Sequence, residues 1–414
     1  MKLRVRPEDF CVSEQPDMEA LGRGDLPLYK LQKYGWNTTD VLDRIARHAS
    51  IPRTWLTYGG RKDRWATTTQ YVSVCSRCTK DLSHRYPPEK QDSRESLPFY
   101  VFERVGATAR PMGPSFIRKN VFKIVVRSLD PGELELVCAR IASQAVKYGH
   151  PNYFDDQRFR GVRPETGFAA ERMLRRQWRG ALQSILGAWG YLDDLKEWEA
   201  WKAEGCEELL HRISEPWLRK VCQHIRENRG DYMGALRLVP REELSMIFSS
   251  YQSFLWDELL RRVLQNLGIT LSVYEGDIGA YFFYEPEDDP AFCEKIERLR
   301  RVQATLPAAK ATFSDELFTS TYSVLLSERG LRPSSFNLRQ LRQAFFKAVP
   351  RDVLVFPSDF RLDGPEPDEV FRGTHKITLN FALPRGCYGT IVVKRLFARP
   401  HPLWPLQPGR RGRV

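Results

Sequence analysis

Apolar residues recur at every fourth position in the middle of the chain. They are Ile247, Tyr251, Leu255, Leu259, Val263 and Leu267. An interval of four places these side chains on one face of an α-helix, so the stretch predicts a long helix with one apolar face. Gly268 follows directly and predicts the end of the helix, because glycine readily adopts the left-handed conformation found there. We expect the aromatic residues of this helix to lie in the core.

Alternating apolar residues predict β-strands elsewhere. In residues 121–129 the apolar side chains Phe122, Ile124 and Val126 stand at every second position, which predicts a strand. An Asp-Pro-Gly turn follows and leads into a predicted helix over residues 133–148. Residues 2–12 are predicted as a charged strand on the same grounds, and residues 378–396 as two strands around a Pro-Arg-Gly turn.

Two more segments have helical spacing. The first follows the capping candidates Thr39 and Asp40, and we expect its apolar face to pack on a sheet. That face consists of Val41, Leu42, Ile45 and Ala46. Residues 174–186 are predicted as one helix whose arginines lie largely on other faces. Residues 75–98 are polar and contain prolines, which predicts a flexible loop or insertion.

Length and charge limit the class of protein. At 414 residues the chain exceeds one typical domain, so two domains are expected. The formal net charge is +12, and an anionic polymer is the natural partner of such an excess. A membrane surface is the competing partner, yet no apolar run approaches ~18 residues and the N-terminal residues lack the apolar core of a signal peptide. We expect a cytoplasmic protein without membrane association.

Metal and cofactor signals are weak. Eight cysteines are scattered along the chain, which predicts reduced thiols. Cys75 and Cys78 alone have zinc-like spacing, and His84 is the only nearby histidine, so no metal site is expected. The acidic turn over residues 285–290 is expected to be solvated. Phosphate-loop, HExxH and GxSxG motifs are missing, so no cofactor is expected; no obligate protein partner is evident either.

The segment Tyr58–Gln70 concentrates charge and glycine around Asp63. Its two glycines allow the backbone to approach a ligand closely. Three cations surround Asp63 and favour its ionised form. They are Arg61, Lys62 and Arg64. An ionised carboxylate in a basic loop suits chemistry on a phosphate-bearing substrate. The alternative is an Asp in a surface salt bridge, and the charge pattern alone favours that alternative.

This segment resembles the signature Ala-Gly-Leu-Lys-Asp-Arg-x-Ala-x-Thr-x-Gln of TruD-type tRNA pseudouridine synthases. The residues in the family order are Gly59-Gly60-Arg61-Lys62-Asp63-Arg64, Ala66, Thr68 and Gln70. The Asp of this signature is catalytic in the family, so the resemblance implies that Asp63 is catalytic. The chain departs from the signature at Gly59 and Arg61, where the family usually has Ala and an apolar residue.

Other motifs of this family match in the same order along the chain. They are Pro7-Glu8-Asp9-Phe10-Cys11-Val12-Ser13-Glu14, Lys33-Tyr34-Gly35-Trp36-Asn37-Thr38, Pro151-Asn152-Tyr153-Phe154-Asp155-Asp156-Gln157-Arg158-Phe159, Ser250–Asp257 and Leu383–Leu396. The chain departs at Asp155 and Arg160, where the family usually has glycines.

The resemblance implies three residues at the substrate. Phe10 is implied as a wall of the uridine pocket, although its pattern alone would predict a core residue. Asn152 is implied as a contact to the target nucleotide, because its amide offers donors and an acceptor. Tyr388 stands where the family has a Phe that touches the target, and it adds a hydroxyl to the stacking face.

Four residues are expected in supporting roles. They are Lys62, Arg4, Gln157 and Arg158. Arg4, or Arg6 in its place, is a candidate for the cation that holds the catalytic Asp ionised. Gln157 and Arg158 are expected either to orient Asn152 or a phosphate, or to belong to a structural hydrogen-bond network.

The resemblance also implies the fold class. It is α+β, with a pseudouridine-synthase catalytic domain whose mixed, mainly antiparallel sheet is flanked by helices and which is interrupted by an inserted α/β domain of the TruD type. Residues 1–177 are expected to form the catalytic domain, completed by residues 363–414, and residues 178–362 the insertion. The tail after Arg399 is expected to be mobile and to lie near phosphates.

The implied activity is that of an isomerase, a tRNA pseudouridine synthase, and RNA, first of all tRNA, is the expected partner. The family commonly modifies the uridine at position thirteen of tRNA. The reaction rearranges atoms within one nucleotide, so it needs no cofactor. Two alternatives remain at this level: a non-catalytic RNA-binding protein or RNA chaperone with the same fold, and a metal-dependent nuclease, which would need clustered carboxylates.

Overall fold

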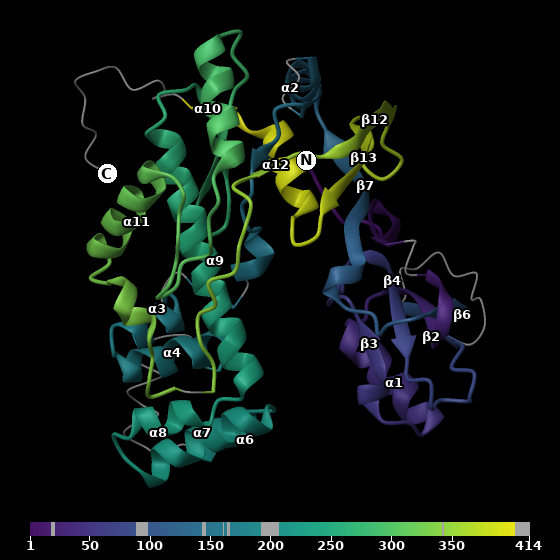
Figure 1. Ribbon diagram of the computed structural model, residues 1–414, viewed down its shortest axis with the longest axis vertical. Helices are drawn as coiled ribbons and strands as arrows, with labels where there is room; N and C mark the ends of the chain where they lie inside the picture. The colour runs from purple at the N-terminus through teal and green to yellow at the C-terminus, as the bar shows by residue number, and fades with distance from the viewer. Residues whose placement is uncertain are drawn as a thin grey trace. The chain divides into compact units, whose positions relative to one another are not determined.

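The protein is described here from a computed structural model. The residues that the structure describes are 1–17, 21–87, 98–142, 146–159, 161–163, 166–191, 207–341 and 343–401. Two compact units are present (Figure 1). The first comprises Met1–Gly149 and Val355–Val392, and the second comprises His150–Leu354 and Val393–Val414. The domain limits expected from the sequence remain a prediction. Residues 88–97 of the predicted loop, Arg160 and most of the basic tail lie outside the described residues.

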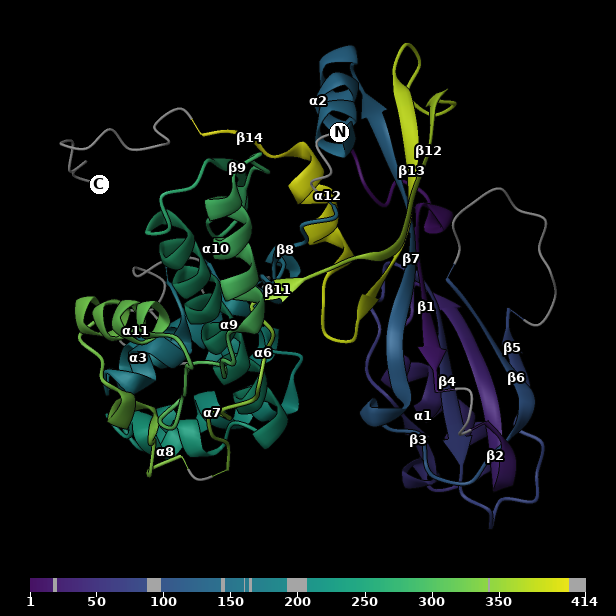
Figure 2. The same ribbon diagram turned by 45° about the horizontal axis from the view of Figure 1, so that its top comes forward.

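One large sheet forms the first unit. In the described residues nine strands take part, in the order β12-β13-β7-β1-β4-β2-β6-β5, with β3 paired to β4 (Figure 2). The strands are β1 (Phe10–Pro16), β2 (Leu21–Tyr34), β3 (Leu56–Tyr58), β4 (Thr67–Val74), β5 (His84–Tyr86), β6 (Phe99–Thr108), β7 (Ile117–Leu129), β12 (Ser358–Pro367) and β13 (His375–Pro384). Among these described strands, β1 and β4 form the one parallel pair of the sheet. The expected mixed sheet in an α+β fold is therefore confirmed.

Helix α1 (Thr38–Ala49) packs on this sheet as expected. Its buried apolar side chains share a core with residues of β2, β3, β4 and β6. This core includes Val41, Leu42, Ile45, Ala46, Leu31, Leu56, Val72 and Phe102. The helix begins after Asn37, before the predicted capping residues Thr39 and Asp40. Ser50 ends it in the left-handed conformation, with φ of 54°.

The C-terminal part of the chain completes the sheet, because β13 lies between β12 and β7. A buried ion cluster joins the same regions. Arg127 of β7 lies 2.9 Å from Asp9 and 3.0 Å from Asp368. The unit also contains η1 (Pro7–Asp9), η3 (Arg53–Trp55), η4 (Pro114–Phe116), α2 (Pro131–Ala142) and the start of α12 (Gly389–Phe397).

Three predictions for this unit are wrong in part. Residues 2–9 form no continuous strand: Lys2 makes a single bridge to Arg127 and the strand begins at Phe10. Residues 389–397 form a helix, because consecutive residues of this segment, such as Ile391, Val392 and Val393, are all buried and show no strand alternation. Residues 75–87 of the predicted loop are ordered, since β5 pairs with β6 and Leu82 is buried.

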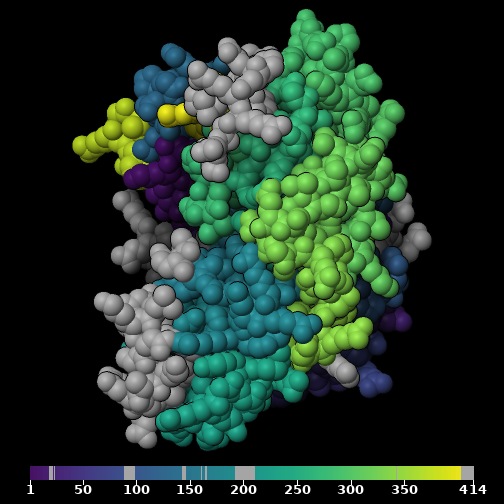
Figure 3. Space-filling model, turned by 90° about the vertical axis from the view of Figure 1, so that its left-hand side faces the viewer, coloured from purple at the N-terminus to yellow at the C-terminus, as the bar shows by residue number. Residues whose placement is uncertain are grey.

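The second unit is mainly helical and contains the predicted long helix, α9 (Arg241–Gln265). Its other elements are β8 (His150–Pro151), η5 (Asp156–Phe159), α3 (Ala169–Leu174), α4 (Trp178–Ala188), α6 (Glu207–Arg212), α7 (Pro216–Glu227), α8 (Tyr232–Arg237), β9 (Leu271–Glu275), β10 (Ala280–Tyr284), α10 (Pro290–Arg301), α11 (Glu316–Glu328), η6 (Pro333–Phe336), β11 (Leu354–Val355) and β14 (Arg399–Pro400). Figure 3 shows α3 and α4, in blue, next to α7 and α8, in teal.

Two features of this unit differ from the predictions. The helix predicted over residues 174–186 is broken into α3 and α4, because Arg176 takes the left-handed conformation with φ of 60°. The three-stranded sheet β10-β9-β14 of the described residues is antiparallel. An α/β domain, which was predicted, would have parallel strand pairs in its sheet.

Candidate active site

Asp63 lies in the loop that joins β3 to β4. Its Oδ1 accepts a hydrogen bond from the backbone N–H of Trp65 at 3.0 Å. Its Oδ2 forms an ion pair with Nη2 of Arg4 at 3.0 Å, and the two side chains are only 21% and 19% exposed. One carboxylate oxygen is thus held by the backbone and the other by a guanidinium, so the negative charge is compensated and its position is fixed.

Arg4 also contacts Phe10. Its guanidinium carbon lies 4.4 Å from the centre of the Phe10 ring, a cation–π distance. The ring itself is 4% exposed and meets Phe122 edge to face at 6.5 Å. The structure therefore brings together three residues singled out in the sequence, Arg4, Phe10 and Asp63. Arg6 does not take the place of Arg4, because it pairs with Glu369.

Lys62 does not take part in the ion pair of the adjacent Asp63 with Arg4. Its Nζ forms an ion pair with Oε1 of the buried Glu14 at 2.9 Å and donates to Oδ1 of Asn120 at 2.8 Å. Burial raises the pKa of Glu14, and Lys62 opposes this rise. The lysine therefore anchors the loop to β1 and β7, while Asp63 faces Arg4.

Lys33 was not singled out in the sequence, although it contacts the Asp63 backbone. Its Nζ donates to the carbonyl oxygen of Asp63 at 2.8 Å and lies 3.5 Å from that of Lys62. The residue is fully buried, and burial lowers the pKa of Lys33 to about 8, although the nearby Asp63 opposes this shift. The only sequence signal for it was its place in the matched Lys-x-Gly-x-Asn-Thr passage.

The buried polar side chains of Thr38 and Gln70 also form hydrogen bonds with the loop that carries Asp63. Thr38 Oγ1 accepts the backbone N–H of Lys62 at 3.1 Å and donates to Gln70 Oε1 at 2.8 Å. Gln70 Nε2 in turn donates to the carbonyl of Gly60 at 3.2 Å. These bonds tie the loop to the first turn of α1 and to β4, so its backbone conformation is set by residues far apart in the sequence.

Tyr388 also belongs to the first unit, between β13 and α12. Its carbonyl oxygen accepts the backbone N–H of Ile391 at 3.1 Å, and its side chain is half-buried. Gly386 two residues earlier has φ of 79°, which makes the turn from strand to helix. Tyr388 is therefore presented by a turn and a helix start, and not by the strand predicted from the sequence.

Asn152 lies in the second unit and is almost fully buried. Its Nδ2 donates to the carbonyl of Asp352 at 2.8 Å, and its Oδ1 accepts from Nη2 of Arg351 at 2.7 Å. Arg158 is also held within this unit, because its Nε donates to Ser253 Oγ of α9 at 3.3 Å. Gln157 lies next to it in η5. In this unit Asn152 and Arg158 both belong to internal hydrogen-bond networks.

The thiols of Cys75 and Cys78 are free, and the described residues contain no group of three or more His, Cys, Asp or Glu side chains that could hold a metal ion. In that same part of the chain, no helix combines the length and the apolar character needed to cross a membrane.

Known proteins resemble this chain over nearly its whole length. The family model described as "tRNA pseudouridine synthase D (TruD)" matches residues 1–396. A tRNA pseudouridine synthase D of Leptospira interrogans is 26% identical over 96% of this chain and 96% of its own length. A "Probable tRNA pseudouridine synthase D 1" of Methanococcus maripaludis is 27% identical over 96% of this chain and 99% of its own length.

A solved structure shares the fold. The crystal structure described as that of the "Putative tRNA pseudouridine synthase D (TruD) from Methanosarcina mazei" superimposes with a TM-score of 0.63 at 22% identity, over 96% of this chain and 93% of the other. The mixed sheet and the match over residues 1–396 lead to one conclusion: the chain belongs to the TruD family of tRNA pseudouridine synthases, which are isomerases.

Proposed function

We propose that this enzyme converts uridine to pseudouridine in tRNA with Asp63 as the catalytic carboxylate, and that its target is the uridine at position thirteen. The assignment of Asp63 is supported by its partly buried ion pair with Arg4 through Oδ2. The other carboxylate oxygen, Oδ1, accepts a hydrogen bond from the backbone N–H of Trp65. Such a carboxylate is placed by the fold before any substrate arrives. The cytoplasm is the compartment that we propose.

The reaction rearranges one nucleoside. The bond between C1′ and N1 breaks, the uracil turns over, and a bond forms between C5 and C1′; C5 loses a hydrogen and N1 gains one. Asp63 takes part either as a nucleophile or as the base that removes a ribose proton, and both roles need a carboxylate anion. Arg4 compensates this charge at 3.0 Å.

The target must leave the base stack to reach Asp63. We assign the aromatic contacts to Phe10 and Tyr388 and the contact to the target nucleotide to Asn152. Phe10 supports this role through its contact with Arg4, because the same guanidinium links the ring to the carboxylate. Lys62, Gln157 and Arg158 are assigned supporting roles: Lys62 anchors the Asp63 loop, and Gln157 and Arg158 orient Asn152 or a phosphate.

Base-resolution mapping of pseudouridine on unmodified tRNA tests this proposal. We expect wild type to modify position thirteen and Asp63→Ala to leave it unmodified. Asp43→Ala is the matched control, because Asp43 also pairs with an arginine of the first unit, at 2.8 Å, and lies outside the proposed site. Modification by Asp63→Ala at the wild-type rate would overturn the role of Asp63. Modification at another position only would overturn the choice of target.

A further inference from the structure

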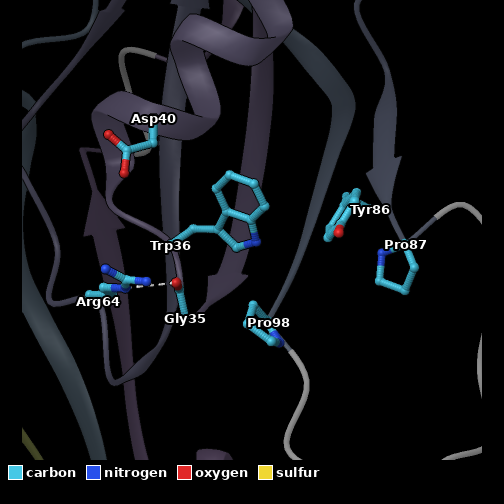
Figure 4. Close-up of a pocket in the computed structure, with 7 residues that line it drawn as sticks. All are labelled: Gly35, Trp36, Asp40, Arg64, Tyr86, Pro87 and Pro98. Carbon is cyan, nitrogen blue, oxygen red and sulfur yellow. Dashed lines mark hydrogen bonds between the residues drawn. The ribbon is translucent and has the colours of Figure 1, made fainter.

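A cavity of about 430 Å³ opens beside the Asp63 loop (Figure 4). It is lined by Gly35, Trp36, Asp40, Arg64, Tyr86, Pro87 and Pro98. Its volume falls in the range of sites that hold small organic groups. Two aromatic rings, one cation and one acid face it, a combination suited to a flat, polar ring. None of its side chains has a part in the proposed chemistry at Asp63.

The aromatic walls are held in place by their neighbours. Trp36 meets Tyr86 edge to face at 5.4 Å and Tyr100 edge to face at 5.5 Å. The guanidinium of Arg44 lies 4.8 Å from the centre of the Tyr86 ring. Ordering of the walls therefore costs little when a ligand enters, because most of their rotational freedom is already lost.

Hydrogen-bonding capacity remains at the cavity. The indole Nε1 of Trp36 is buried and has no hydrogen-bond partner in the described part of the chain. In Figure 4 this nitrogen lies on the side of the indole that faces Tyr86 and Pro98. A buried N–H without an acceptor costs free energy, which an incoming carbonyl or ring nitrogen would recover. Asp40, at the rim, offers a carboxylate to an exocyclic amine.

Arg64 connects the cavity to the proposed catalytic loop. It directly follows Asp63, and its backbone carbonyl accepts the N–H of Gly35 at 2.8 Å. Its side chain is exposed, and Nε donates back to the carbonyl of Gly35 at 2.9 Å. This bond fixes the guanidinium at the cavity, and its terminal nitrogens form no ion pair with a described residue. They are thus placed to bind a phosphate.

We propose that this cavity binds a second nucleotide of the RNA, near the target uridine, with its base against the contacting pair of rings Trp36 and Tyr86 and its phosphate on Arg64. The inference rests on the proposed function, since it takes the RNA substrate as the ligand. Unpaired bases in RNA are commonly bound on aromatic side chains and guanidinium planes, and this cavity offers both.

Binding of synthetic tRNAs tests the proposal. Each RNA carries one abasic ribose at an unpaired position near the target, and Kd is measured with Asp63→Ala protein, so that turnover plays no part. We expect one abasic position to weaken binding about 5- to 150-fold, the range for loss of one stacked base. Trp36→Leu should weaken binding of intact RNA by a similar factor and should remove most of the penalty at that one position.

Trp55→Leu is the matched control, because Trp55 packs on the same core, also partly buried, and does not line the cavity. It should retain the full abasic penalty. An unchanged penalty in Trp36→Leu would overturn the proposal. Failure of Asp63 as a catalyst would appear in the mapping experiment and leave these affinities unchanged, so the two failures can be told apart.

An exposed variant guards against loss of folding. Arg64→Gln should weaken binding and reduce the slope of log K against log salt by about 1, the effect of one lost phosphate contact. Arg47→Gln is its control, because Arg47 is also exposed and its Nε also donates to a backbone carbonyl, that of Asp43 at 3.3 Å. Equal slopes for the two variants would overturn the phosphate contact.

Discussion

Arg4 has a backbone conformation that few residues of its size adopt. Its φ is 58°, in the left-handed region, where a side chain clashes with the backbone. Such strain persists only where surrounding contacts hold it. Here the guanidinium meets both the Phe10 ring and the Asp63 carboxylate. The unusual backbone therefore places one cation between an aromatic ring and the proposed catalytic group.

Removal of this cation should slow the reaction more than it weakens RNA binding. We expect Arg4→Gln to reduce kcat about 100-fold, because Asp63 loses a preorganised charge partner. Arg4→Lys should retain part of the activity, since a single cation remains within reach. Single-turnover rates and RNA affinity, measured separately, distinguish the two effects. A kcat for Arg4→Gln equal to that of wild type would contradict this expectation.

Lys33 gives a prediction for stability against pH. Burial lowers its pKa from 10.5 to about 8, so between these values the unfolded chain binds the proton that the folded protein releases. Folding stability should therefore rise with pH from about 8 to about 10.5, by up to ~3 kcal/mol. Lys33→Met should lack this rise. Urea unfolding of both proteins across this range, compared as a difference, isolates the contribution of Lys33; equal pH dependence would rule it out.

The sequence predicted part of the site at this scale. Asp63 was expected from its matched motif, and Arg4 was one of two arginines, with Arg6, expected to pair with it, although both precede the motif that begins at Pro7. Lys33 and Asn120 were not, since their bonds to the Asp63 loop span 30 and 58 residues and depend on strand pairing. A sequence pattern reports neighbours along the chain, whereas these contacts depend on which strands lie side by side.

At the scale of secondary-structure elements, a buried ion cluster joins segments that are far apart in the sequence. Arg127 of β7 binds Asp9 just before β1 and Asp368 just after β12, and all three side chains are buried. Asp9 precedes Phe10, so this cluster fixes the chain at the start of the strand that carries the aromatic residue of the proposed site.

Loss of the central cation should destabilise the first unit. We expect Arg127→Met to lower the free energy of unfolding by about 3–5 kcal/mol, because two buried carboxylates lose the cation that compensates their charge. Arg361→Met is the control, since Arg361 pairs with Asp363 but is 70% exposed. Its effect should stay within about 0.5 kcal/mol. Similar unfolding midpoints in urea for the two variants would contradict a stabilising role of the buried cluster.

Elements with a clear period were predicted and others were not. Helix α9 and strand β7 followed from spacings of four and two residues. Helix α12 was predicted as a strand, because the β-branched run Ile391, Val392 and Val393 has no polar position from which a helical period could be read. In the structure all three side chains are buried. The break between α3 and α4 was missed because the left-handed residue at this break is an arginine, not a glycine.

At the scale of the whole molecule, the chain forms much of the second unit, residues 150–354, before it returns to the first unit. The segment Val355–Val392 adds β12 and β13 to the sheet begun by residues 10–129, and it carries Tyr388. The resemblance predicted this closure, since a family motif lies near the C-terminus. The proposed domain limits, 1–177 with 363–414 and 178–362, differ in extent from the two compact units.

A chain truncated after Leu354 should fail to form a stable first unit. It lacks β13, whose residues 375–384 pair with most of β7. Without β13, this side of β7 is an unpaired sheet edge. We expect such a chain to aggregate and to lose hydrogen-exchange protection in β7 and β1. Cooperative unfolding of the truncated protein with protected β7 amides would contradict this expectation.

The position of β13 also has a consequence for synthesis on the ribosome. Strand β7 ends at residue 129 and its partner begins at residue 375, which is 246 residues later. At a translation rate of ~5–20 residues per second, the nascent chain carries an unpaired β7 edge for roughly 10 to 50 seconds. During this interval that edge of β7 is open to pairing with strands of neighbouring nascent chains.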